Sequence, residues 1–214
     1  YLATQSAFRE QGDLERRLLA AREQGNHLVV YRSGSAHVTN SFTLLGQIQE
    51  GVRQALLARG CELPMTPTLY QVVLEKLDGP DSPFNWEAAF RRHEEVFPDF
   101  PDADAVVRRL RTGLDDEENA ELLARIHQVM SQEGYTVLGD PQTVKAWLGE
   151  VIEAARLKSI VFIWDEFTEY FRQTSSTTTL QELAHLSASV PFYLFLITHK
   201  APEVARQYVD EAEW

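Results

Sequence analysis

"IVFIWDEFTEYF", residues 160–171, places five apolar residues directly before two adjacent carboxylates, Asp165 and Glu166. A short apolar run rich in β-branched and aromatic residues is typical of a buried β-strand. In an open parallel sheet, ligands bind beyond the carboxyl ends of the strands. The stretch therefore predicts a strand at about 160–164 that presents two carboxylates at the ligand-binding edge of a sheet.

Two further apolar runs predict the other strands, at about 27–32 ("HLVVYR") and 192–198 ("FYLFLIT"). Elsewhere, over 13–24, 42–56 and most of 62–157, apolar residues recur at spacings of three and four, as in amphipathic helices. This succession of strands and helices implies an α/β fold, in which a parallel sheet carries helices on its faces.

Several polar residues predict where helices begin, because Ser, Thr, Asp and Asn side chains accept hydrogen bonds from the first helical N–H groups. Thr179 and Glu182 have the spacing of a capping box, Thr-x-x-Glu. The other predicted starts are Asn40–Ser41, Thr66–Pro67, Asn85, Asp102 and Asp140–Pro141. The helix predicted at 13–24 carries on one face Leu14, Leu18, Leu19 and Ala21.

Composition limits the classes of protein to which the chain can belong. It has 214 residues, 44% of them apolar, and a net charge of −12. Because nonspecific nucleic-acid affinity comes mainly from clustered Lys and Arg, we do not expect direct nucleic-acid binding. No apolar run approaches the roughly 18–20 residues needed to cross a bilayer, and no signal pattern opens the chain. We therefore expect a cytoplasmic protein without a membrane segment.

The sequence has one cysteine, Cys61, which cannot form an intrachain disulfide.

The carboxylate pair has two interpretations. In the first, Asp165 holds a water of a hydrated Mg²⁺, and Glu166 orients or deprotonates a water aimed at a phosphate. This is the chemistry of a Walker B site. In the second, Asp165 only caps the helix that begins near Glu166, because carboxylates are favoured at helix N-termini.

Three stretches carry a resemblance to a known group of ATPases: "VFIWDEFTEYF", the later "FLITHK", and the early "HLVVYRSGSAHVTNSFTLLGQIQEGVRQAL". They resemble the large P-loop ATPases of bacterial anti-phage systems of the BREX-type and related kinds. More broadly, they resemble the AAA+ and STAND branch of P-loop NTPases. In that pattern a phosphate-binding loop and its helix come first, followed by a second strand, a helical insertion, the Walker B strand and a sensor strand.

The resemblance implies ATP hydrolysis with Mg²⁺ in a parallel P-loop NTPase-type sheet. Asp165 would hold the hydrated metal, Glu166 would activate water, and Thr198 or His199 would sense the γ-phosphate. It also implies ATPase core segments at 1–61 and 158–214 around a helical insertion at 62–157. The implied partners are other subunits of a defence or DNA-processing assembly, or further copies of the chain.

The sequence departs from this pattern at the phosphate-binding loop. No G-x-x-x-x-G-K-[ST] motif is present, and no glycine is followed by lysine. We therefore expect the loop to precede Tyr1 in a longer protein, and we expect this chain alone to be inactive. If no such loop exists, the competing hypothesis is a non-catalytic α/β module that binds a partner.

Other polar residues have weaker functional interpretations. The segment 33–37, "SGSAH", has no nucleophile elbow, which argues against a serine hydrolase and favours a loop bordering a nucleotide or partner. Glu169 could join an acidic cluster with Asp165. Arg172 and Arg206 could each act on a neighbouring subunit's phosphate.

Overall fold

The computed structural model describes residues 25–35, 38–62, 66–112, 117–135, 137, 139–173 and 178–198. Three features predicted above lie outside these ranges: the helix at 13–24, His199 and Arg206. Their positions stay predictions.

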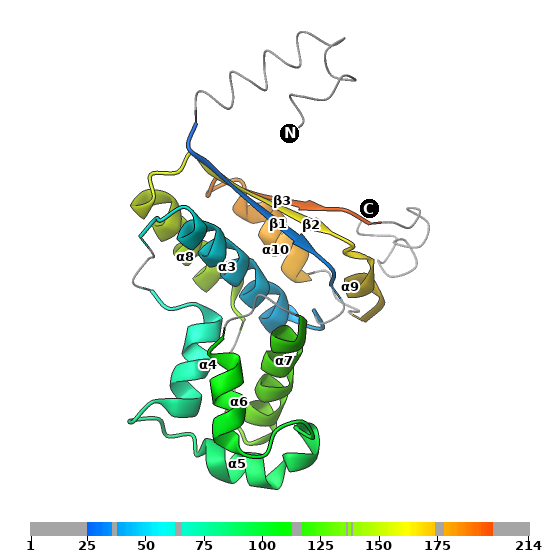
Figure 1. The fold of residues 1–214 in the computed structure, drawn as a ribbon. Helices are drawn as coiled ribbons and strands as arrows, with labels where there is room; N and C mark the ends of the chain where they lie inside the picture. The colour runs from blue at the N-terminus through cyan, green and yellow to red at the C-terminus, as the bar shows by residue number, and fades with distance from the viewer. Residues whose placement is uncertain are drawn as a thin grey trace.

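The sheet has three parallel strands in the order β1-β2-β3 (Figure 1), formed by His27–Ser33, Ser159–Asp165 and Phe192–Leu196. The predicted α/β fold with a parallel sheet is confirmed. The third strand ends two residues earlier than expected, although the N–H of Ile197 still donates to the carbonyl of Trp164 at 2.8 Å. The strand that leads to Asp165 is the central one, so it is hydrogen-bonded along both edges.

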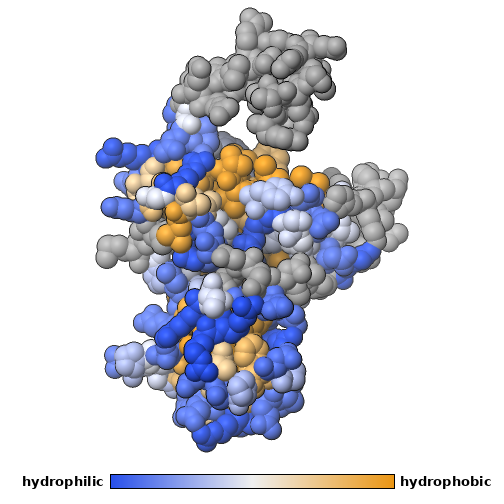
Figure 2. All heavy atoms as spheres, in the orientation of Figure 1, coloured by the Kyte–Doolittle hydropathy of each residue, from blue (hydrophilic) through white to orange (hydrophobic). Residues whose placement is uncertain are grey.

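One face of the sheet is covered by three helices, α3 (Ser41–Ala58), α8 (Pro141–Ala154) and α10 (Thr178–Leu186). Helix α3 packs on β1, α10 packs on β3, and α8 packs against both helices. The strand residues that are buried on this face are Leu28, Val30, Ile160, Phe162, Trp164 and Phe192. The residues between them point to the opposite face, where hydrophobic side chains gather over the strands in the upper part of Figure 2.

Gly51 lets α3 approach the sheet closely. A Cβ atom at this position would lie 3.0 Å from Phe162 and 3.2 Å from Val30. Gly46, on the same helix, has open space where its Cβ would be. The two glycines therefore differ in what a methyl group would meet.

This difference predicts opposite effects of the same substitution. Gly46→Ala should raise the free energy of unfolding by about 0.5–1 kcal/mol, because alanine loses less backbone entropy in a helix. Gly51→Ala should be about 1–3 kcal/mol less stable than Gly46→Ala, because the added methyl group overpacks the contact with Phe162. Urea denaturation of both variants measures the difference, and equal stabilities would contradict the close approach.

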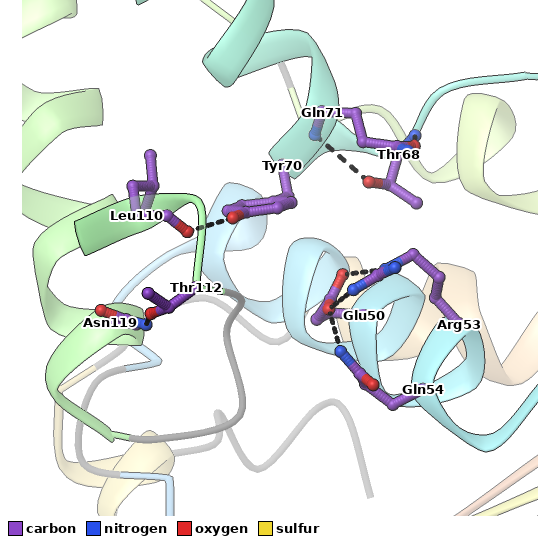
Figure 3. Close-up of polar contacts among 9 residues, drawn as sticks. All are labelled: Glu50, Arg53, Gln54, Thr68, Tyr70, Gln71, Leu110, Thr112 and Asn119. Atoms are coloured by element: carbon purple, nitrogen blue, oxygen red, sulfur yellow. Dashed lines mark hydrogen bonds and ion pairs between the residues drawn. The ribbon is translucent and has the colours of Figure 1, made fainter. Parts of the chain in front are cut away.

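The remaining helices between α3 and β2 pack as a group, which lies below α3 in Figure 1 and contacts it. They are α4 (Leu69–Asp78), α5 (Trp86–Arg92), a short 3-10 helix (Glu94–Val96), α6 (Ala103–Leu110) and α7 (Glu117–Gln132). The Tyr70 hydroxyl of α4 donates to the carbonyl of Leu110 (Figure 3), and the Trp86 indole donates to the carbonyl of Ala103 at 3.1 Å. These buried hydrogen bonds join α4 and α5 to α6, and one continuous hydrophobic core extends from this group to the sheet.

The predicted helix starts are mostly confirmed: Asn40, Asn85, Asp102 and Asp140 each cap a helix. Two are wrong. Helix α4 begins at Leu69 and is capped by Thr68 instead of Thr66. Helix α10 begins at Thr178, so Thr179 lies within its first turn, where its hydroxyl is 2.5 Å from that of Ser41. A tertiary contact has taken the place of the expected cap.

Candidate functional site

The carboxylate pair lies where the two neighbouring strands β1 and β2 end together. Asp165 is the last residue of β2, and its register partner Ser33 is the last residue of β1. The N–H of Gly34 donates to the carbonyl of Asp165 at 3.0 Å, which continues the pairing one residue further. The side chains that follow both strands therefore meet at one edge of the sheet.

The Asp165 side chain is half-buried, and its hydrogen bonds hold it at this edge. Its Oδ2 accepts a hydrogen bond from the Tyr31 hydroxyl at 3.1 Å, and its Oδ1 accepts one from the N–H of Glu166 at 2.8 Å. The next helix, α9 (Thr168–Gln173), begins three residues after Asp165. An N-cap residue directly precedes its helix, so the position of Asp165 does not fit the capping interpretation.

Glu166 has an unusual backbone conformation, with φ at +56°. A left-handed conformation of a non-glycine residue costs about 1–3 kcal/mol and persists only where the surroundings enforce it. Here the Ser35 hydroxyl donates to the carbonyl of Glu166 at 3.1 Å and accepts from the N–H of Tyr170 at 3.1 Å. The Ser33 hydroxyl donates to Oε2 of Glu166 at 3.1 Å. Two serines from the end of β1 therefore fix both the backbone and the exposed side chain of Glu166.

A group of packed aromatic side chains lies next to this edge. Trp164 and Phe167 are buried and pack edge to face, and Phe167 stacks on the buried ring of Tyr170. The Trp164 indole N–H donates to the carbonyl of Gly34 at 2.8 Å, which ties this group to the loop after β1. Packed aromatic rings restrict the movement of the chain that carries Asp165 and Glu166.

The strand end that was expected to act as a sensor lies beside the pair. The N–H of Phe167 donates to the carbonyl of Ile197 at 2.9 Å, and Thr198 follows Ile197 with an exposed side chain. Thr198 therefore shares the edge with Asp165 and Glu166. His199, its proposed alternative, lies outside the residues that the structure describes.

Two other candidates form a local pair on α9. Glu169 and Arg172 make an ion pair one turn apart along the helix. This contact gives Glu169 a cation of its own and occupies the guanidinium of Arg172. The proposed roles of Glu169 in an acidic cluster and of Arg172 in a neighbour's site stay predictions.

Sequence reasoning did not identify Tyr31 as part of the site. The hydrogen bond to Asp165 is the main cause of a raised pKa of the Tyr31 hydroxyl, and partial loss of solvation and the charge of Asp165 add to it. Tyr31 and Ser33 share a face of β1, and an alignment of the predicted strand ends would have placed them next to Asp165. Residues 33–35 lie at the end of β1 and border the pair, and the expected contact of the "SGSAH" loop with a nucleotide or partner stays a prediction.

The chemistry of these side chains can be compared with what a metal ion requires. Across the described ranges, no group of three or more His, Cys, Asp or Glu side chains could hold a metal ion directly. Mg²⁺ usually keeps several waters and is bound through one or two carboxylates together with substrate phosphates. Asp165, with the Ser33 hydroxyl and Glu166 nearby, fits an ion held through its waters.

Charged residues also line a hollow on the helical group, between α6 and α7, away from this edge. Arg109 and Arg125 line it, and they pair with Glu118 and Glu121 respectively. Asp99 is a third carboxylate in the lining, so carboxylates outnumber the arginines, and each arginine has a carboxylate partner at this surface.

Comparison of the chain with protein-family models, curated proteins and solved structures gave no match. Among the helices that the structure describes, none is long and apolar enough to cross a membrane. A proposal for the function therefore depends on the geometry of the carboxyl edge and on the sequence resemblance.

Proposed function

We propose that the chain supplies the Walker B half of a Mg²⁺-dependent ATPase site. The observation that carries the proposal is Glu166: an exposed carboxylate in a left-handed conformation, fixed by two serines at the end of the central strand. Strained residues of this kind cluster at active sites, where the strain serves to position a group. The order of a strand, a helical region, an acidic strand and a sensor-like strand also follows the pattern of the P-loop ATPases that the sequence resembles.

In this proposal each residue at the edge has a distinct task. Asp165, held by Tyr31, accepts hydrogen bonds from the waters of the ion. The Ser33 hydroxyl fixes one carboxylate oxygen of Glu166. Glu166 would orient a water for attack on the γ-phosphate and take the proton of that water. Thr198 donates its hydroxyl hydrogen to a phosphate oxygen. When bound, Mg²⁺ neutralises charge on the phosphates.

The proposal requires a phosphate-binding loop from outside residues 1–214, since this sequence has no Gly-Lys pair. We place this loop before Tyr1 in the complete protein. The role in a defence or DNA-processing assembly follows from the resemblance alone. A non-catalytic interaction module is the second candidate, and the exposed apolar face of the sheet is the observation in its favour.

The test is nucleotide binding by the complete protein with Mg²⁺ as the variable. We expect a fluorescent ATP analogue to bind at least tenfold more tightly with Mg²⁺ than with EDTA, and Asp165→Asn to remove this difference, because the amide is a weaker partner for hydrated Mg²⁺. Glu169→Gln is the matched control, since Glu169 already pairs with Arg172. Binding that is absent, or equally Mg²⁺-dependent in Asp165→Asn, would reject the proposal.

A further inference from the structure

The face of the sheet opposite α3, α8 and α10, which we call the open face, is apolar and exposed. Five of its side chains are between 43% and 62% exposed: Val29, Tyr31, Tyr193, Phe195 and Ile197. Val161 and Ile163 of the central strand lie half-buried between them. Figure 2 shows hydrophobic atoms gathered over these strands. All-parallel sheets occur almost only with both faces covered, so this face needs an occupant.

The connections between the strands explain why the helices that the structure describes cover only one face. The strand order follows the chain order, so both crossovers step in the same direction along the sheet. Right-handed crossovers that step in one direction place their helices on the same face. The elements that lie between β1 and β3 are therefore committed to the covered face. The occupant must come from the segment before β1, from the segment after β3, or from another chain.

We infer that residues 13–24 form a helix that covers this face. The segment ends two residues before β1, and Asn26 anchors that point: its side chain donates to the carbonyls of Ala155 and Arg156 at 3.1 and 3.3 Å. The N–H of Lys158 donates to the carbonyl of Asn26 at 2.8 Å. Gly25 alone then separates the segment from a fixed position at the amino end of the sheet.

Gly25 lies against the ring of His27. A Cβ atom at position 25 would collide with that ring. The His27 side chain lies on the open face, where its Nδ1 is 2.8 Å from the Ser159 hydroxyl. Because glycine has no Cβ, the chain can pass this close to the open face. Twelve helical residues span about 18 Å and the seven residues of β1 about 23 Å, so a helix that folds back from Gly25 extends along most of the strand.

The composition of the segment suits the face. Leu14, Leu18 and Ala21 recur at spacings of four and three, which gives a helix one apolar stripe. Arg16 and Glu23 fall on the opposite side of such a helix. Residues 1–24 contain four arginines and four carboxylates, whereas residues 199–214 carry four carboxylates against Lys200 and Arg206. An acidic segment would be repelled by Asp165 and Glu166 at the carboxyl edge of the sheet. Residues 1–24, whose charges balance, are therefore favoured over residues 199–214 as the segment that covers the open face.

The test measures access of a thiol reagent to the open face in the full chain. Val29→Cys is introduced together with Cys61→Ser, and the rate of maleimide labelling is measured under native conditions. We expect labelling at least tenfold slower than that of the unfolded chain. The double substitution Leu14→Gln and Leu18→Gln should restore most of the lost rate. The matched control, Arg16→Gln and Glu23→Gln, alters the other side of the helix and should leave the rate unchanged.

Each other outcome overturns the inference. Labelling of Val29→Cys as fast as in the unfolded chain means that the face is open. Protection that disappears on dilution means that a second copy covers it. Protection that survives the leucine substitutions but is lost in Val204→Gln with Tyr208→Gln means that the C-terminal segment covers it. Phe195→Cys serves as a second probe on β3, and circular dichroism confirms that each variant remains folded.

Discussion

Replacing Glu166 by Gln should lower ATP turnover by the complete protein about 10²–10⁴-fold, the range that general acid–base catalysis contributes. The amide cannot take a proton from the attacking water. It keeps an oxygen that can accept the hydrogen bond of the Ser33 hydroxyl, and it leaves the backbone held by Ser35. ATP affinity should therefore change less than threefold. Steady-state phosphate release and equilibrium binding of ATP measure the two effects separately.

The control for this experiment is Glu169→Gln, three residues further along the chain. Glu169 is paired with Arg172 within α9, so its loss should leave turnover nearly unchanged. Equal turnover in Glu166→Gln and the unmodified protein would refute the role of Glu166 as a base. If Glu166→Gln lost folding and binding together, the carboxylate would have a structural role instead.

Sequence patterns located the strands and most helix starts because those signals are local. After Ser159, the run "IVFIW" consists of β-branched and aromatic residues, and it lies in the central strand. Asn40 and Asp140 cap their helices through bonds to N–H groups two or three residues away. Such contacts depend only on nearby residues, so they can be recognised without knowledge of the fold.

The features that escaped prediction depend on contacts between distant parts of the chain. Thr179 was expected to cap a helix, but it meets Ser41, which is 138 positions earlier. Tyr31 and Ser33 join the candidate site only through the register of β1 with β2. The left-handed conformation of Glu166 depends on Ser35, which is 131 positions away. Residue pattern alone contains no information about these pairings, whereas the position of Asp165 and Glu166 at a strand end followed from the local sequence.

The largest effect on stability should come from Arg53, which is paired with a buried carboxylate on α3 (Figure 3). The Glu50 side chain is completely buried. Its Oε2 accepts from Nε of Arg53 at 2.8 Å, and its Oε1 accepts from the Gln54 amide at 2.9 Å. The adjacent residue, Gln49, accepts a hydrogen bond from the N–H of Leu69 at 2.9 Å, so this region of α3 contacts the start of α4. Loss of the guanidinium would leave the carboxylate buried next to a neutral donor only.

Arg53→Ala should therefore lower the free energy of unfolding by about 3–5 kcal/mol, as expected when one partner of a buried ion pair is removed. Urea denaturation measures the loss. Arg91→Ala is the matched control, because Arg91 pairs with Glu87 one turn away and both side chains are exposed; its effect should be within experimental error. The double substitution Glu50→Met and Arg53→Met should recover most of the stability, since it removes the buried charge together with its partner.

A loss of stability below about 1 kcal/mol in Arg53→Ala would contradict this expectation. It would mean that water reaches the Glu50 carboxylate once the arginine is gone. The junction between α3 and α4 would then open locally, without unfolding of the whole protein.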